Sequence, residues 1–368
     1  MRPIFTREQL ATVCYQFQLP GAFADGSPYG SGHINDTFLV TLAAPERFIL
    51  QRINRNIFPD VPALMDNIRR VTSHAAHKLG QATAPADRNR VLTLVPTRDG
   101  RPFLCDAAGD YWRIYDFIEG ARTHDVLQEP AQARAAAFAF GQFQELLADL
   151  PAPRLHETIP FFHHTRKRFA ALERAVSADP QGRVALAGPE IAAARERAAM
   201  ADRLLGLLAA GRIPERITHN DTKLNNVMLD DATGRAVCVI DLDTVMPGLA
   251  LYDFGDMVRT ATNAAAEDEI DPAKVQSRLP VFAALVEGYL AAAGRFLLPA
   301  EVDELVFSGR LLTFENGIRF LTDFLQGDTY YKIARPHQNL DRTRAQFALL
   351  RSMEAQAAEM EDLVRLHR

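Results

Sequence analysis

The sequence has little cysteine and tryptophan, no excess of positive charge and no long apolar run. Its 368 residues include three cysteines and one tryptophan, and 41 lysines and arginines stand against 46 aspartates and glutamates, a net charge of −5. Without a basic excess, neither nucleic acid nor an anionic membrane surface is an expected partner. No apolar run reaches the roughly 18 to 20 residues of a membrane span, and the N-terminal segment lacks a signal pattern. We therefore expect a cytoplasmic protein that binds neither nucleic acid nor membrane.

The three cysteines, Cys14, Cys105 and Cys238, are far apart and form no C-x-x-C pair. This spacing excludes a disulfide framework and a cysteine zinc site, so we interpret all three as small buried hydrophobes. Apolar residues make up 48% of the chain, enough for a sizeable core. A chain of this length is expected to form two or more domains at about 150 residues each.

The first third of the chain has the pattern of strands with one helix among them. A hairpin is predicted over residues 37–42 and 47–53, because two β-type runs flank a short turn. Pro62 then begins a helical pattern that continues to about residue 79. Three more short strands, rich in β-branched and aromatic residues, are predicted over 91–97, 102–106 and 111–117.

From Glu119 onward, helical patterns predominate. Helices are predicted over 132–147, 188–210, 275–293, 302–325 and 342–366, and a single small hairpin over 227–229 and 236–240. The predicted fold class is therefore α+β with two lobes. A small antiparallel-sheet N-lobe is expected over residues 1–118 and a larger, mostly helical C-lobe over 119–368.

The strongest motif is the octapeptide His219–Asn226, which fits H-x-D-x-K-x-x-N and is followed one hairpin later by Asp241. Phosphoryl transfer requires a carboxylate that accepts the hydroxyl proton, oxygen ligands for a metal ion and cations that meet the phosphate charge. Asp221 is the predicted base, Asn226 and Asp241 are the predicted Mg²⁺ ligands, and Lys223 is predicted to meet the γ-phosphate. The hairpin returns the chain so that Asp241 is expected beside the loop.

Three further residues near this motif are predicted to support it. The Asp253-Phe254-Gly255 tripeptide imitates the metal-binding DFG of protein kinases, but no strand precedes it, so the metal is assigned to Asp241. Asp253 is expected to cap a helix or to accept hydrogen bonds from the catalytic loop, and His219 to support that loop. Asp243 has two interpretations, contact with a second metal ion or a cap of the turn that follows it.

In the N-lobe, a glycine-containing segment precedes the first strand of the hairpin. Its residues Gly30, Ser31, Gly32 and His33 are predicted to bring backbone N–H groups to the nucleotide phosphates, with an ordinary turn as the alternative. A P-loop is excluded, because no G-K-[ST] occurs.

Arg52 stands where the V-A-I-K strand of kinases carries lysine, and it is predicted to bind phosphates bidentately. A solvated residue on an edge strand is the alternative, and Asp66 is the candidate helical partner of Arg52. Two histidine clusters are set aside. His74 and His77 are interpreted as a surface helix face, since a third metal ligand is missing, and His163-His164 as a solvated helix start.

With these motifs the chain resembles the aminoglycoside phosphotransferase and choline kinase superfamily, which has a protein-kinase-like fold. Stretches similar to its N-acetylhexosamine 1-kinase branch are residues 48–58, 63–72, 219–256 and 315–332. The resemblance implies Asp221 as base, magnesium on Asn226 and Asp241, and a hinge over Tyr115, Phe117 and Ile118 whose backbone receives the adenine of ATP. Members of the superfamily often have glycine where Asn220 stands.

The stretch around Glu315 also has an interpretation without the family. On a helix, Glu315, Arg319 and Asp323 form one charged strip between two apolar faces. Such a strip either pairs internally, Glu315 with Arg319, or lines a polar cavity. In a cavity, Arg319 and Asp323 would bind sugar hydroxyls, and Tyr330 or Tyr331 would stack on the sugar face.

The sequence thus predicts an ATP- and Mg²⁺-dependent kinase for a small sugar substrate, with the anomeric hydroxyl of an N-acetylhexosamine as the acceptor. A kinase for another hydroxyl compound, such as homoserine, choline or an aminoglycoside, is the alternative within enzymes. The only tryptophan, Trp112, is expected away from the acceptor, which disfavours an aromatic cage for a cation. A nucleotide-binding pseudokinase stays open because of arginine at position 52, whereas protein kinase activity is disfavoured by the lack of an A-P-E segment.

Overall fold

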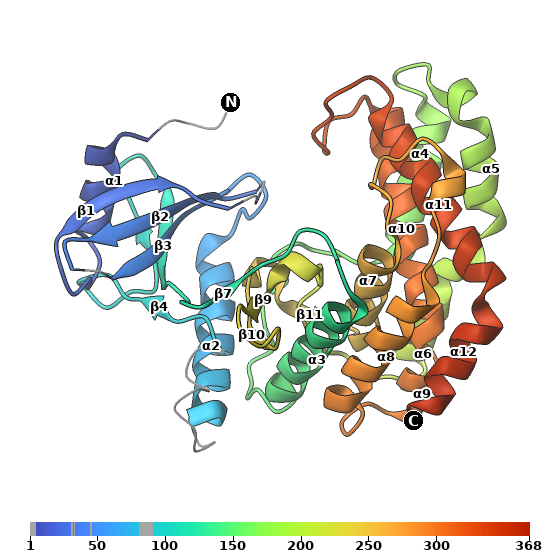
Figure 1. The fold of residues 1–368 in the computed structure, drawn as a ribbon. Helices are drawn as coiled ribbons and strands as arrows, with labels where there is room; N and C mark the ends of the chain where they lie inside the picture. Colours follow the sequence, from blue (N-terminus) through green and yellow to red (C-terminus); the bar gives the residue numbers. More distant parts are fainter. Residues whose placement is uncertain (1–4, 31, 33, 45, 81–90) are drawn as a thin grey trace.

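An antiparallel sheet with two flanking helices forms one end of the molecule, and a bundle of helices forms the other (Figure 1). The structure is a computed structural model, and it describes residues 5–368 except 31, 33, 45 and 81–90. The predicted fold class is confirmed. The lobe boundary predicted at residue 118 stays a prediction; the last strand of the N-lobe sheet ends at Asp116.

The N-lobe sheet has the strand order β1-β2-β3-β6-β4, with β5 paired to β6, and all its pairs are antiparallel. The predicted hairpin is β2–β3 and is confirmed, whereas the strands expected over 91–97 and 102–106 shorten to β4 and β5. Strand β1 was not predicted, because Asp, Gly, Ser and Pro in its sequence are typical of turns. The strands are β1 Phe23–Pro28, β2 Asp36–Leu42, β3 Arg47–Ile53, β4 Leu94–Val95, β5 Leu104–Cys105 and β6 Tyr111–Asp116.

The two faces of this sheet pack against different helices. Helix α1 (Arg7–Cys14) shares one buried cluster with Phe48 and Leu50 of β3, while α2 (Val61–Gly80) shares another with Ile53 of the same strand. Alternation along β3 separates the two sets, since successive side chains point to opposite faces. The face toward α2 is therefore also the face toward the C-lobe core, which includes residues of α2 and α3 in the same cluster.

The C-lobe helices confirm most of the predicted segments, but two predicted helices are interrupted. Residues 188–210 divide into α5 and α6 around a 3-10 turn, where the Arg197 guanidinium binds Glu354. Residues 342–366 divide at Gln356. The helices are α3 Pro130–Leu147, α4 Thr165–Ala178, α5 Gly188–Glu196, α6 Arg203–Ala209, α7 Ala250–Thr262, α8 Leu279–Ala293, α9 Pro299–Val302, α10 Leu305–Gln326, α11 Gln338–Ala355 and α12 Ala357–Leu366.

Helices α7 and α10 approach each other closely at a glycine. A Cβ added to Gly255 would lie 2.4 Å from the carbonyl oxygen of Ser308, a distance that backbone atoms do not allow. Any larger residue would push the helices apart.

Two small sheets hold the catalytic segments. In one, β8 (Arg216–Thr218) pairs with β11 (Met246–Gly248), and in the other β9 (Val227–Asp230) pairs with β10 (Ala236–Val239) and with β7 (Ala121–Arg122). The predicted hairpin is β9–β10 and is confirmed. The expectation of a single β segment in this lobe is wrong, because strands of two or three residues carry too little pattern to be recognised.

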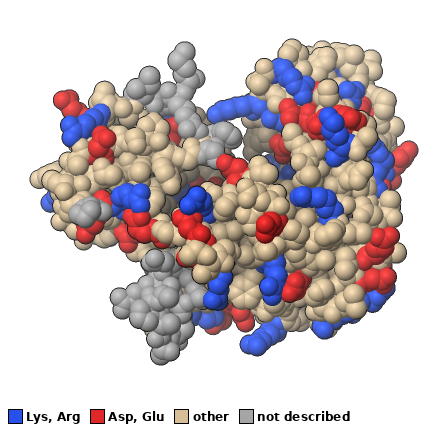
Figure 2. All heavy atoms as spheres, in the orientation of Figure 1, with Lys and Arg blue, Asp and Glu red and all other residues tan. Residues whose placement is uncertain are grey.

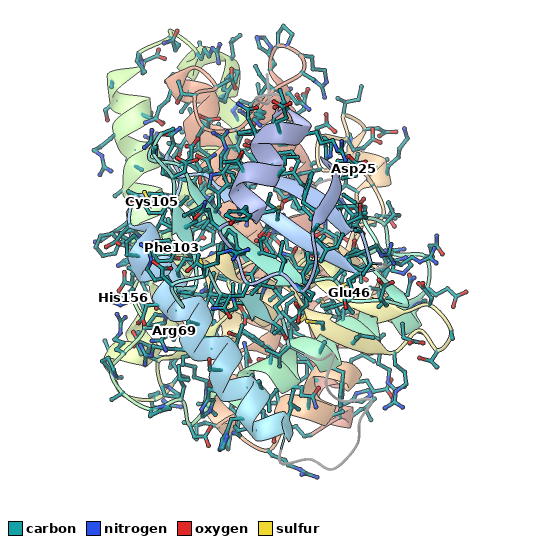
Figure 3. All side chains as sticks on the ribbon, turned by 90° about the vertical axis from the view of Figure 1, so that its left-hand side faces the viewer. Asp25, Glu46, Arg69, Phe103, Cys105 and His156 are labelled. Atoms are coloured by element: carbon teal, nitrogen blue, oxygen red, sulfur yellow. The ribbon has the colours of Figure 1, made fainter. Side chains whose placement is uncertain are left out.

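Two expectations about buried and apolar segments can be compared with the structure. Cys14 and Cys238 are buried as predicted, but Cys105 is exposed, on a two-residue strand at the periphery of the N-lobe in Figure 3. Within the described residues, no helix combines the length and apolarity needed to cross a membrane.

Candidate active site

Asp221 lies in the loop between β8 and β9 together with the two polar residues that the motif placed near it. Lys223 Nζ is 2.8 Å from Asp221 Oδ1, and Asn226 Nδ2 donates to the backbone oxygen of Asp221 at 2.8 Å and to Oδ2 at 3.2 Å. Burial by itself raises the pKa of Asp221, but the charge and hydrogen bond of Lys223 outweigh it, and the pKa lies below its usual value. The predicted base is therefore an ionised carboxylate.

Asp241 reaches the same place from the end of β10. The chain is tied there by a hydrogen bond from Ile240 N–H to the Asn226 carbonyl, at 2.9 Å, and Asp241 itself adopts a left-handed φ of 59°. Asp241 is exposed, and its carboxylate accepts no hydrogen bond from any described residue. The pKa of Asp241 is raised to about 6, because nearby protein atoms partly desolvate the carboxylate and because Asp243 and Asp221 are negative.

This donor set fits a magnesium ion. Asn226 donates its Nδ2 hydrogens to Asp221, so its Oδ1 remains as the atom that would bind a metal. Asp241 adds a carboxylate oxygen that accepts no hydrogen bond from a described residue. Magnesium characteristically binds one or two protein side chains and takes its other ligands from water and substrate phosphates. Among the described residues no group of three or more His, Cys, Asp or Glu side chains forms an alternative metal cage.

His219 and Asp253 hold the loop from behind. His219 Nδ1 accepts from the Asp221 amide at 3.3 Å, and its Nε2 donates to the Ile240 carbonyl at 2.9 Å. The buried Asp253 carboxylate accepts from the amides of His219 and Asn220, at 2.9 and 2.7 Å. The prediction that Asp253 binds the loop backbone is confirmed. These bonds hold Asn220 in a left-handed conformation, with φ of 65°, which is costly for a non-glycine residue.

Asp243 does neither of the two things expected of it. Its carboxylate is 3% exposed, with Oδ1 2.5 Å from Arg113 Nη1 of β6 and Oδ2 2.6 Å from Asn35 Nδ2. Arg113 Nε also donates to Gln51 of β3 at 2.9 Å. Both interpretations, second metal ligand and turn cap, are therefore wrong, since both oxygens are engaged by the N-lobe. Asp243 joins the lobes instead.

Arg52 does not face the cleft, so the prediction that it binds phosphate is wrong. It shares a sheet face with Phe48 and Leu50, and its guanidinium is bound by Asp36 at 2.7 Å and Asp110 at 3.0 Å. The neighbour Gln51 occupies the cleft side, because alternation along a strand reverses direction at every residue. The proposed partner Asp66 binds its own helix neighbours Arg69 and Arg70 instead, and Figure 3 places Arg69 on α2.

The predicted phosphate loop lies in sequence between β1 and β2. Gly30 has a φ of 76°, which favours glycine, and the positions beside Gly30 and Gly32 are open space. Ser31 and His33 lie outside the described residues. Figure 2 shows the surface hollowed between the two lobes on this side of the molecule. A phosphate role for Gly30 and Gly32 stays a prediction.

The predicted adenine hinge has one amide available. Phe117 N–H donates to the Arg47 carbonyl at 3.3 Å, and the amide before it is also engaged, whereas the Ile118 amide binds no described residue. The Tyr115 side chain is buried in the core, and its hydroxyl has no hydrogen-bond partner among the described residues. Any adenine contact from this segment is therefore expected at the backbone of Ile118.

The residues of the charged strip of α10 make different contacts. Asp323 is buried and accepts from the amides of Thr329, Tyr330 and Tyr331 at 2.8 to 2.9 Å, so its predicted contact with sugar hydroxyls is wrong. It shapes the loop that presents the two tyrosines. Among the described residues Arg319 forms no ion pair and lies over the rings of Phe162 and Tyr331, at 5.3 and 5.8 Å to their centroids.

One interpretation expected Glu315 to pair with Arg319, but the two side chains form no ion pair. Glu315 binds His163 at 2.8 Å and Thr165 at 2.6 Å, and His163 is 4% exposed. The interpretation of His163 as part of a solvated helix start is therefore wrong. No local pattern shows this contact, because its partners are 152 residues apart.

Two arginines near the candidate site were not predicted from the sequence. Arg113 stands among apolar residues of β6, and a charge in such a strand is a usable signal. The buried Arg259 binds Asp256 at 2.8 Å on α7, and its charge helps to lower the pKa of Asp221. The i, i+3 spacing of Asp256 and Arg259 on a helix predicts this ion pair.

Comparison with known proteins gives a family match and a set of similar folds. Residues 25–305 match the APH phosphotransferase enzyme family. An aminoglycoside phosphotransferase from Alicyclobacillus acidocaldarius subsp. acidocaldarius DSM 446 aligns over 99% of this chain and 98% of its own, with 14% identity and a TM-score of 0.64. A choline kinase from Cryptosporidium parvum Iowa II aligns over 96% and 97%, with 14% identity and a TM-score of 0.56. A microcompartment-associated aminopropanol kinase aligns over 96% and 98%, with 14% identity and a TM-score of 0.57.

Proposed function

This chain belongs to the phosphotransferase enzyme family, and from that premise we propose that it is a kinase that transfers the γ-phosphoryl group of ATP to a sugar hydroxyl. The observation that carries the proposal is the meeting of Asp221, Asn226 and Asp241 from two chain segments at one point of the cleft. A carboxylate base beside an amide and an unpaired carboxylate is the set that phosphoryl transfer needs.

In the proposed reaction Asp221 accepts the proton of the acceptor hydroxyl. The oxygen freed of its proton bonds to the γ-phosphorus, the bond from that phosphorus to the bridging oxygen of ADP breaks, and ADP leaves with the electron pair. Lys223 is paired with Asp221 at 2.8 Å, and in the proposed reaction its ammonium group meets the charge of the transferred group. When bound at Asn226 and Asp241, Mg²⁺ supplies neutralisation of the phosphate oxygens.

The acceptor we propose is an N-acetylhexosamine, phosphorylated at its anomeric hydroxyl. Arg168 and Arg319 form no ion pair with a described residue; the Arg168 guanidinium donates to the Phe162 carbonyl, and burial together with the charge of Arg319 lowers the pKa of Arg168. The buried Tyr331 hydroxyl beside Arg319 also lacks a partner among the described residues. Unpaired guanidinium groups with a free hydroxyl suit the carbonyl and hydroxyl oxygens of an acetamido sugar. They repel an ammonium group, which disfavours amine acceptors such as choline, aminopropanol or an aminoglycoside.

The experiment is an assay of ADP release with Mg-ATP and a panel of acetamido sugars, plain hexoses, choline and an aminoglycoside, followed by NMR location of the phosphate. The proposal expects turnover with acetamido sugars and phosphate on C1. Turnover confined to an amine acceptor would replace it with the alternative kinase function. ATP binding without turnover across the panel would support a pseudokinase, an alternative weakened because Arg52, on which it rested, lies outside the cleft.

A further inference from the structure

His163 bridges two parts of the C-lobe at the start of α4. Its Nδ1 lies 2.8 Å from Glu315 Oε1 on α10, and its Nε2 lies 3.0 Å from the carbonyl oxygen of Asn220 in the catalytic loop. The ring is held in place by Phe162 and Tyr252, with ring centroids at 4.6 and 5.3 Å. Each ring nitrogen therefore has a single, well-defined partner.

The chemistry of the partners sets the direction of one hydrogen bond. A backbone carbonyl only accepts, so Nε2 of His163 carries a hydrogen and donates to the Asn220 carbonyl. At the other end, the buried Glu315 also accepts from the Thr165 hydroxyl at 2.6 Å, so both of its oxygens are engaged. The bridge is therefore fixed at both ends.

The contact on the loop is at the residue that precedes the base. Asn220 is in the left-handed region, its amide is fixed by Asp253, and its side chain donates to the Thr244 carbonyl at 3.0 Å. His163 fixes the remaining group, the carbonyl of the Asn220–Asp221 peptide. The orientation of that peptide determines where the Asp221 side chain points.

The other end of the bridge is on the helix that carries the ligand-facing arginine. Glu315 precedes Arg319 by four residues, one turn of α10, so both side chains leave the same side of the helix. The bridge therefore links the wall proposed to bind the acceptor with the loop proposed to deprotonate it. A misplacement of about 1 Å between such groups costs about 10²-fold in rate.

We propose that His163, together with Glu315, positions the Asn220–Asp221 peptide relative to helix α10. His163 and Glu315 are not expected to touch either substrate, so both are positioning residues. The role in turnover rests on the proposed kinase function, but the hold of His163 on the loop does not.

Two variants and a matched control test the role in turnover. His163→Gln keeps one donor but loses the ring contacts with Phe162 and Tyr252, and Glu315→Gln keeps the shape of the carboxylate but removes its charge. Each is expected to lower kcat by about 10- to 100-fold while the Kd for ATP stays within about twofold. His164→Gln is the control, since His164 only accepts from the Lys167 amide at the start of the same helix. Unchanged kcat in both variants, with His164→Gln also unchanged, would overturn the positioning role.

Hydrogen exchange tests the structural claim without any acceptor. Exchange of the Asp221 amide is expected to be faster in His163→Gln and in Glu315→Gln than in the wild type or His164→Gln. Exchange as slow as in the wild type in both variants would overturn the proposal even if the enzyme is active. Faster exchange in the variants of a protein that phosphorylates nothing would leave the structural part of the proposal standing and refute the proposed function alone.

Discussion

The two segments of the candidate active site are each held by a buried side-chain pair, and the pairs differ in what they join. Arg113 and Asp243 connect strand β6 of the N-lobe to the segment that follows Asp241. His163 and Glu315 connect two C-lobe helices to the residue that precedes Asp221. The proposed metal ligand Asp241 is thus tied to the arrangement of the lobes, whereas the proposed base Asp221 is tied to the helix proposed to bind the acceptor.

Because the two pairs join different parts of the protein, mutations in them are expected to have different effects. Loss of the Arg113 pair leaves a buried charge at the junction of the lobes and is expected to affect stability and nucleotide binding first. Loss of the His163 pair acts within one lobe and is expected to affect turnover. Because the pairs share no residue and serve different segments, their effects are expected to be nearly additive.

The largest effect is expected at the proposed base, which lies in one of the two segments. Asp221→Asn removes the proton acceptor but keeps the shape of the side chain, so kcat is expected to fall by about 10²- to 10⁴-fold, the range of general-base catalysis. Rapid-quench measurement of the chemical step, with ATP affinity by calorimetry, checks both parts. A variant with undiminished kcat would show that Asp221 is not the base.

The next effect breaks the pair between the lobes. Arg113→Met leaves Asp243 buried and uncompensated, and the free energy of unfolding is expected to fall by about 3 to 5 kcal/mol. Urea denaturation measures it. The double variant Arg113→Met with Asp243→Asn is the control and is expected to recover part of the loss. A single variant as stable as the wild type would show that the pair does not hold the lobes.

A smaller effect is expected at the acceptor wall. Arg319→Lys keeps the charge but loses the planar fork, and hydrogen bonds from charged groups contribute about 1.5 to 3 kcal/mol. The KM for the acceptor is expected to rise by about 10- to 100-fold with the KM for ATP unchanged. Arg310→Lys, on the same helix but over Phe307, is the matched control. An increase in the KM for ATP instead would show that Arg319 does not bind the acceptor.

The smallest effect is expected at Arg52. Its ion pairs with Asp36 and Asp110 are partly exposed, and such pairs contribute about 0 to 1 kcal/mol. Arg52→Gln is expected to change the KM for ATP by less than about twofold. A rise of tenfold or more in the KM for ATP would show that Arg52 binds the phosphates, as its position in place of the kinase lysine suggested.

The sequence predicted the elements whose signal is local. The octapeptide His219–Asn226 and the hairpin to Asp241 placed base and metal ligands together, and the periodicity of α2, α3 and α10 set the main helices. Arg52 was misassigned because a one-residue difference in register reverses the face of a strand. The partners of Asp243 and Glu315 could not be predicted from local sequence patterns, since each buried contact joins residues more than 100 positions apart. Asp323 was misassigned because sequence does not distinguish a charge that folds a loop from one that faces a ligand.

The most direct test of the single phosphotransfer site is calorimetric titration of ATP with Mg²⁺ and with EDTA, for the wild type and Asp241→Asn. The wild type is expected to bind ATP more tightly with Mg²⁺, and Asp241→Asn to bind it equally in both conditions. If Asp241→Asn kept the full gain from Mg²⁺, the metal would lie elsewhere and the assignment of the cleft would be wrong.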